Sequence, residues 1–193
     1  MEDALSKLVP MDADINTIVD DKEILLTAWD LNNRSPRFFT KWSYENLANE
    51  KQDSKMALGK MTLASATTPY YFKPATIQPA GCASCKPNLY ISGDNVAMSP
   101  AMFAVLHANE KLGKNLADIR VVSVGAINEE PERIKEQTSL LEWALRLTSL
   151  NAPVKKHTQD YMLRYFLRKG EKANELYKFE IDKSREFELD FYR

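Results

Sequence analysis

The chain has 193 residues and a formal net charge of −1, with 44% hydrophobic and 27% charged residues. This balance is typical of a globular protein with a sizeable core, and it excludes a disordered chain or a fibre. Basic residues are spread along the sequence, so no electrostatic footprint for nucleic acid is expected. Charged residues interrupt the longest apolar stretches, which are therefore too short to cross the ~30 Å hydrocarbon core of a membrane.

The length predicts one domain over residues 1–193. The opening segment MEDALSKLVPMDAD is acidic and lacks the positive and apolar regions of a secretion signal, as well as the arginines of a transit peptide. We therefore expect a cytoplasmic location, with a peripheral membrane or an organellar location as the alternatives.

The first predicted elements are two strands and a helix. The apolar run KEILLTAWDL begins at Lys22 and predicts a strand buried on both faces, followed by the turn DLNNRSPR and a second strand at FFTKW. Residues 56–66, MALGKMTLASA, place small and apolar side chains at helical spacing, and Pro69 ends this helix.

A strand, a capped helix and a further strand follow. Residues 88–91, NLYI, predict a short strand. Ser99 and Pro100 then provide the N-cap and the first position of a helix that Gly113 ends. The run DIRVVSVGA, residues 118–126, predicts another buried strand.

Two helices and a strand are predicted for the last third of the chain. The helices span residues 132–150 and 158–168. We assign the apolar face of the second helix to the core, with a lipid-binding surface as the alternative. This face consists of Tyr161, Met162, Tyr165 and Phe166. Residues 175–193 alternate apolar and charged side chains, which predicts a strand with one side in solvent.

The order of these elements indicates the fold class. Strands that alternate with helices are typical of α/β proteins, in which connecting helices cover the faces of the sheet. We therefore predict an α/β fold with a mostly parallel sheet in three layers, with helices on both faces.

The cysteines and histidines give no indication of a metal or cofactor. Cys82 and Cys85 form a lone Cys-x-x-Cys without the second ligand pair that zinc requires, and the two histidines are far away in the sequence. The interpretation we favour is a polar loop with two free thiols. His107 and His157 both fall on predicted helices without a neighbouring nucleophile, so ordinary structural histidines are expected.

The glycines exclude several kinds of catalytic loop. The chain has six glycines, and no two of them have the spacing of the Gly-x-Ser-x-Gly nucleophile elbow. There is also no Gly-rich run for an oxyanion hole, a phosphate loop or a dinucleotide site. Among the carboxylates, only Asp94 follows a glycine at a strand-to-helix junction, where an acid could orient another group. The alternative is a turn aspartate that bonds its own backbone.

Four segments of the chain, in order, share their patterns with one protein family: LLTAWDLNNRSPRFF, LASATTPYYFKPATI, LYISGDNVAMSPAMFAV and VVSVGAINE. They resemble the family's Asp-Leu-Asn strand and turn, its Ala-Thr-Ser-Ala-Ala-Pro-x-x-Phe-x-Pro segment, its Asp-Gly-Gly-x-x-x-Asn-Asn-Pro segment and its Ser-Leu-Gly-Thr-Gly strand. The family is that of the patatin-like phospholipases, which are lipid acyl hydrolases. The resemblance is clearest over residues 22–125 and covers only a C-terminal part of the family's domain, without its Gly-rich loop and its Gly-x-Ser-x-Gly serine.

The resemblance implies a partial patatin-like acyl-hydrolase fold and a known mechanism. In the family, the aspartate of Asp-Gly-Gly takes the proton of the serine that attacks the lipid ester. Here Ser92 matches that aspartate and Asp94 matches the second glycine, with Gly93 in register between them. A hydroxyl has no basicity near neutral pH, so Ser92 cannot replace the aspartate. Asp94 is displaced from the aspartate's position by up to ~7 Å along an extended chain, which is too far for a direct proton transfer.

Three hypotheses follow. The first is a patatin-like lipid acyl hydrolase family member that is catalytically inactive by itself and acts as a structural subunit, whose incomplete sheet a protein partner or an oligomer covers. The second is half of a composite lipolytic site, whose serine comes from another segment or chain and whose base is Asp94. The third is a lipid-binding module that uses residues 161–166 or 70–72 as a surface for an acyl chain.

Overall fold

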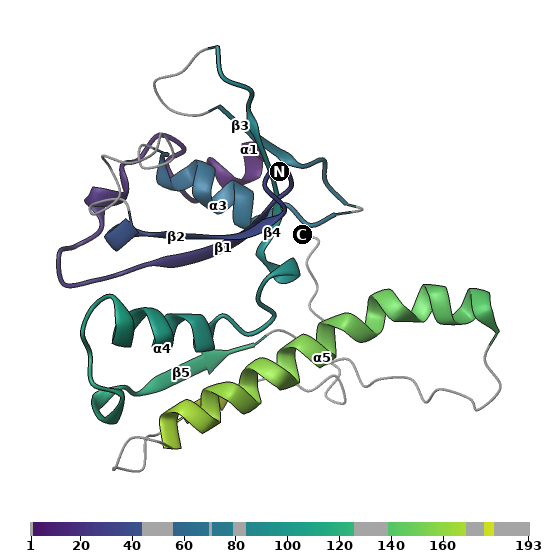
Figure 1. Ribbon diagram of the computed structural model, residues 1–193. Helices are drawn as coiled ribbons and strands as arrows, with labels where there is room; N and C mark the ends of the chain where they lie inside the picture. The colour runs from purple at the N-terminus through teal and green to yellow at the C-terminus, as the bar shows by residue number, and fades with distance from the viewer. Residues whose placement is uncertain are drawn as a thin grey trace, which may run out of the picture. The chain divides into compact units, whose positions relative to one another are not determined.

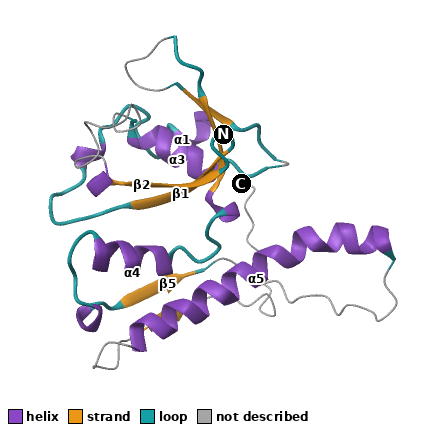
Figure 2. Cartoon of the chain, viewed as in Figure 1, coloured by secondary structure: helices purple, strands orange, loops and turns teal. Residues whose placement is uncertain are grey.

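The computed structural model describes residues 2–43, 56–69, 71–78, 84–125, 139–168 and 176–179. The chain divides into two compact units, an N-terminal unit, Met1–Pro100, and a C-terminal unit, Ala101–Arg193. Figure 1 follows the chain through both, and Figure 2 separates helices, strands and loops. The single domain over residues 1–193 stays a prediction. None of the described helices combines the length and the apolar character that a membrane crossing needs.

The N-terminal unit contains a four-stranded sheet in the order β2-β1-β4-β3. Its strands are β1 (Leu25–Asp30), β2 (Ser35–Thr40), β3 (Ala75–Ile77) and β4 (Asn88–Ser92). β1 pairs with β2 and β4, β3 pairs with β4, and all three pairings are antiparallel. This arrangement differs from the mostly parallel sheet that we predicted. Residues 31–34 alone connect β1 to β2, and such a short connection can join only antiparallel neighbours.

Helix α3 (Leu58–Ala66) covers one face of this sheet (Figure 1). The core between them contains Ala28, Phe39, Met61, Ala64 and Tyr90, and Phe39 and Tyr90 make an edge-to-face ring contact at 5.7 Å between centroids. The N-terminal segment also packs here. Its short elements are α1 (Glu2–Leu5) and the 3₁₀ turn η1 (Ile15–Thr17), and Ile15 is fully buried in the same core.

Among its described residues, the C-terminal unit has two α-helices, two strands and the 3₁₀ turn η4 (Leu116–Asp118). The helices and strands are α4 (Ala101–Glu110), β5 (Val121–Val124), α5 (Leu140–Arg168) and β6 (Leu176–Phe179). β5 and β6 are parallel, and their core consists of Met102, Val105, Val121, Leu163 and Leu167. α4 begins directly after Pro100, as predicted. The chain leaves it through Gly113, whose φ of 64° suits a residue without a side chain.

The two helices predicted over residues 132–150 and 158–168 form one helix, α5, where the structure describes them. Residues 132–138 lie outside the described residues. Pro153 lies between the two predicted helices and within α5. A proline removes one backbone N–H from a helix, but its fixed φ of about −65° is itself helical, so the chain can continue through it.

The predicted core stripe on α5 is wrong. Gln159, Leu163 and Leu167 are the buried residues of this part of the helix, whereas Tyr161 and Tyr165 are 73% and 51% exposed. Leu163 and Leu167 are four residues apart, so they follow the helical repeat and form a narrower buried stripe beside the aromatic one. Tyr161, Met162 and Tyr165 therefore belong to the surface of α5, whereas Phe166 is half-buried.

The sheet of the C-terminal unit also presents apolar side chains outward. The exposed large side chains on it are Val122, Val124, Tyr177 and Phe179. We predicted a buried strand over 118–126 and a charged solvent face after residue 175. In β6 the two aromatic side chains face outward instead, whereas Lys178 is half-buried and pairs with Asp160 of α5. The part of the last predicted strand beyond residue 179 lies outside the described residues.

Candidate functional site

The candidate site lies where β4 ends and the 3₁₀ turn η3 (Gly93–Asn95) begins. Ser92 is the last residue of β4 and is 2% exposed. Its backbone N–H donates to the carbonyl of Thr67 at 2.7 Å, which ties the junction to the end of α3. Its hydroxyl oxygen accepts a hydrogen bond from the backbone N–H of Asp94 at 3.2 Å. Ser92 is thus the N-cap of the turn.

Gly93 is held against strand β1. A Cβ atom at this position would lie 2.1 Å from Oγ1 and 2.2 Å from the backbone oxygen of Thr27. The carbonyl of Gly93 also accepts the backbone N–H groups of Val96 and Ala97, both at 2.8 Å. The glycine therefore permits an approach of two backbones that no other residue allows.

Asp94 points to a different environment from that of Ser92. The residue is exposed, whereas Ser92 is buried. The backbone N–H of Asp94 donates to Oγ of Ser92, but the Asp94 carboxylate makes no hydrogen bond or ion pair within the described residues. The alternative of an aspartate that caps its own turn is not what the structure has, because Ser92 supplies the capping oxygen.

Sequence reasoning missed the buried carboxylate of Asp30. This residue is 4% exposed and ends β1, where it pairs in register with Tyr90 of β4. Its Oδ1 accepts the backbone N–H groups of Asn32 and Asn33 at 2.9 and 3.0 Å, and its Oδ2 accepts Nδ2 of Asn33 at 2.8 Å. Asn32 in turn accepts the N–H of Leu89 at 2.9 Å. With these bonds Asp30 holds the turn between β1 and β2. The sequence DLNN is typical of such a turn and is the signal that could have indicated this role.

The two histidines belong to a different unit from Ser92. His107 lies on α4 and His157 on α5, both in the C-terminal unit. No group of three or more His, Cys, Asp or Glu side chains among the described residues could hold a metal ion. The expectation of free thiols is wrong for Cys85, which is disulfide-bonded, and Cys82 lies outside the described residues. Only two residues separate the cysteines of the Cys-x-x-Cys sequence, and such a short separation is compatible with a disulfide bond.

The chemistry open to this site is limited by its contacts. The hydrogen bonds of Ser92 are to backbone groups and to the amide of Asn95, so within the described residues no carboxylate or imidazole is placed to take its proton. No protein-family model matches the sequence, and no curated protein matches it. The patatin-like resemblance of residues 22–125 stays a prediction from the four sequence segments.

Proposed function

We propose that the chain is a patatin-like family member that is catalytically inactive by itself and acts as a structural or partner-binding subunit. The observation that carries this proposal is the state of Ser92. At the position of the family's aspartate, the chain has a buried hydroxyl that accepts a backbone hydrogen bond of its own turn. Such a hydroxyl does not accept a proton from a nucleophile, and it carries no negative charge that would assist the proton transfer.

The packing of Gly93 supports the loss of activity. An active turn would need the carboxylate of Asp94 in the place of Ser92, which requires the turn to slide by two residues. Gly93 lies so close to Thr27 that a slide would push a side chain into the backbone of β1. In this proposal Asp94 therefore does not compensate for the serine that stands in place of the family's aspartate.

The outward apolar face of β5 and β6 supports a role in binding a partner. Val124 is 81% exposed and Phe179 is 59% exposed, and the other members of the face are Val122 and Tyr177. Contiguous apolar side chains on a surface commonly mark protein interfaces. In this proposal the chain is the C-terminal part of a patatin-like domain, to which β5 and β6 contribute a parallel pair. The proposed location is the cytoplasm.

A fluorophosphonate serine trap tests the inactive state. We expect no adduct by intact-mass analysis, because no described base activates Ser92 and the hydroxyl is buried. A competent serine hydrolase labelled in the same tube controls for the reagent. An adduct that maps to Ser92 and disappears in Ser92→Ala would overturn the proposal.

The composite lipolytic site is the second candidate, and the free carboxylate of Asp94 favours it. This carboxylate is exposed and has no partner within the described residues, so it is open to a group from another chain. If the site is composite, Asp94→Ala abolishes ester hydrolysis by the chain assembled with a Gly-x-Ser-x-Gly partner, since the general base is lost. Glu110→Ala, which removes another exposed carboxylate, serves as the matched control. Equal turnover by the two variants excludes Asp94 as the base.

A further inference from the structure

The second half of helix α5, residues 154–168, has an outward face of apolar side chains (Figure 1). The exposed large members of this face are Val154, Tyr161, Met162 and Tyr165. Two residues advance a helix by ~200°, so the two tyrosines lie almost opposite the buried leucines, Leu163 and Leu167. The face therefore points away from the core of the C-terminal unit.

Two arginines border this outward face. Arg164 follows Tyr161 by three residues, and side chains at this spacing are neighbours on the surface of a helix. Arg168 follows Tyr165 in the same way. Both arginines are exposed, and neither makes a hydrogen bond or an ion pair within the described residues. Their positive charges are therefore open to a partner.

Negative charge is scarce in the same part of the helix. Residues 154–168 contain four basic residues and one acidic residue, Asp160. The Asp160 side chain is only 13% exposed and pairs with Lys178 of β6. The outward face of α5 is therefore locally positive, although the whole chain has a net charge of −1.

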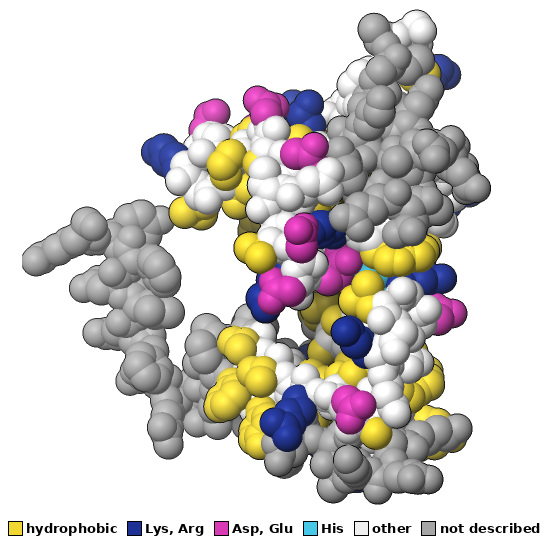
Figure 3. Space-filling model, turned by 90° about the vertical axis from the view of Figure 1, so that its left-hand side faces the viewer, with side chains coloured by type: hydrophobic (Ala, Val, Ile, Leu, Met, Phe, Trp, Pro, Cys, Tyr) yellow, Lys and Arg dark blue, Asp and Glu magenta, His cyan; other side chains and the backbone are white. Residues whose placement is uncertain are grey.

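The combination of tyrosines and arginines distinguishes this face from other exposed apolar residues. Apolar side chains reach the surface in several places (Figure 3), so exposure alone does not indicate a site. Tyrosine is enriched at the interface between membrane and water, because its ring is apolar and its hydroxyl is polar. Arginine pairs well with phosphate, and its long side chain can reach the headgroups from a helix that lies in this interface. A positively charged helix with an apolar face is typical of binding in the plane of a membrane surface.

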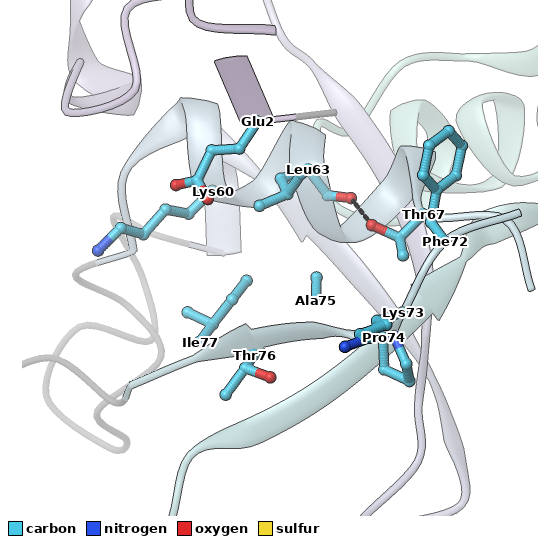
Figure 4. A pocket seen from close by; sticks show the side chains of 10 residues that line it. All are labelled: Glu2, Lys60, Leu63, Thr67, Phe72, Lys73, Pro74, Ala75, Thr76 and Ile77. Carbon is cyan, nitrogen blue, oxygen red and sulfur yellow. Dashed lines mark hydrogen bonds between the residues drawn. The ribbon is translucent and has the colours of Figure 1, made fainter. Parts of the chain in front are cut away.

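The chain contacts such a lipid surface without enclosing a lipid in the groove between α3 and β3 (Figure 4). This groove has a volume of about 320 Å³, which is room for roughly ten groups of the size of water. A lipid with two acyl chains has several times as many non-hydrogen atoms and does not fit. The outward face of α5 is convex, as the surface of any helix is, and it suits an extended surface.

We propose that the outward face of α5 binds the surface of a membrane that contains anionic phospholipids. The two tyrosines enter the headgroup region, and the two arginines pair with lipid phosphates. The cytoplasmic leaflet is negatively charged, which agrees with the proposed location of the chain. The proposal involves neither Ser92 nor the outward face of β5 and β6, so it is independent of the proposed inactive state.

Co-sedimentation of the full-length chain with vesicles tests the charge requirement. We expect binding to phosphatidylcholine vesicles with about 30% phosphatidylserine, and at least about tenfold weaker binding to phosphatidylcholine alone. A rise in NaCl from about 0.1 to about 1 M should weaken the binding, because salt screens exposed charges. Equal binding to both kinds of vesicle, or no binding to the anionic ones, would overturn the proposal.

A charge variant locates the contact on α5. Arg164→Gln with Arg168→Gln is expected to weaken binding to the anionic vesicles at least about tenfold. The matched control is Lys114→Gln with Arg120→Gln, which removes two exposed positive charges of the same unit outside α5. If the control weakens binding as much as the arginine variant, net charge governs the binding and the proposal is wrong.

A tyrosine variant tests the apolar part of the contact. Tyr161→Ser with Tyr165→Ser is expected to weaken binding at least about tenfold, because less apolar surface enters the membrane. Binding as strong as that of the wild type would contradict the proposal. So would binding to soluble polyglutamate without binding to vesicles, which would indicate an acidic protein as the partner. All of the replaced side chains are exposed, so thermal melts should agree with the wild type.

Discussion

Gly93→Ala is expected to lower the free energy of unfolding of the N-terminal unit by about 3 kcal/mol or more. The new methyl group would lie 2.1 Å from Oγ1 and 2.2 Å from the backbone oxygen of Thr27, so β1 and the turn η3 must separate. Separation breaks the pairing of Ala28 with Ser92 at the end of β4. Urea denaturation gives the loss of stability, and hydrogen exchange of β1 and β4 assigns it to this unit.

Two further variants distinguish the cause. Thr27→Ala combined with Gly93→Ala removes the side-chain contact but leaves the backbone oxygen at 2.2 Å, so little rescue is expected. Asp94→Ala changes an exposed neighbour and should alter stability by less than about 0.5 kcal/mol. If Gly93→Ala is as stable as the wild type, β1 and the turn do not approach as described, and the argument that the turn cannot slide fails with it.

Asp30→Ala is expected to destabilise the same unit by about 3 kcal/mol. The substitution removes the acceptor of three hydrogen bonds and leaves the N–H groups of Asn32 and Asn33 without their partner in a partly buried turn. Asp30→Asn keeps one acceptor oxygen, so its cost should be about 1 kcal/mol. Urea denaturation measures the loss of stability of both variants. Hydrogen exchange of the Leu89 amide, which donates to Asn32, shows whether the turn is intact.

The matched control for Asp30 is Asp21→Ala, whose exposed carboxylate pairs with the neighbouring Lys22 at 2.8 Å. A change of less than about 0.5 kcal/mol is expected there. An Asp30→Ala variant that behaves like this control would show that the bonds of the turn do not stabilise the hairpin.

Local patterns were sufficient to predict most elements of the chain. The helix after Pro100 was predicted because serine, proline and glycine mark its ends, and β1 was predicted because its apolar run is dense. The predicted parallel direction was wrong for the four-stranded sheet, because apolar runs are compatible with either direction. The short connection over residues 31–34 is the signal that indicates antiparallel pairing.

Burial on α5 and β6 could not be decided from the sequence. Two stripes on α5 are apolar enough to pack, and the aromatic stripe with Tyr161 and Tyr165 is the larger, yet Leu163 and Leu167 are the buried ones. The half-buried ion pair between Asp160 and Lys178 joins residues from two separate elements. A contact of this kind depends on the tertiary fold and leaves no local pattern.

The candidate site was predicted in its position and not in its contacts. Ser92, Gly93 and Asp94 lie at a strand-to-turn junction, as the sequence indicated. The closeness of Thr27 to Gly93 could not be inferred, because it depends on how β1 packs beside a turn far away in the sequence. The position of Asp94 relative to Ser92 depends on the same packing.

The capping role of Ser92 has a consequence for how such a position evolves. Serine and aspartate are about equally good N-caps, because each offers a side-chain oxygen to the same backbone N–H. Ser92 uses its hydroxyl in this way. An exchange between the two residues would therefore keep the cap of the turn. Position 92 is only 2% exposed, however, so an aspartate there would bury its charge at a cost to the stability of the N-terminal unit. Of the two directions of exchange, only aspartate to serine avoids this cost.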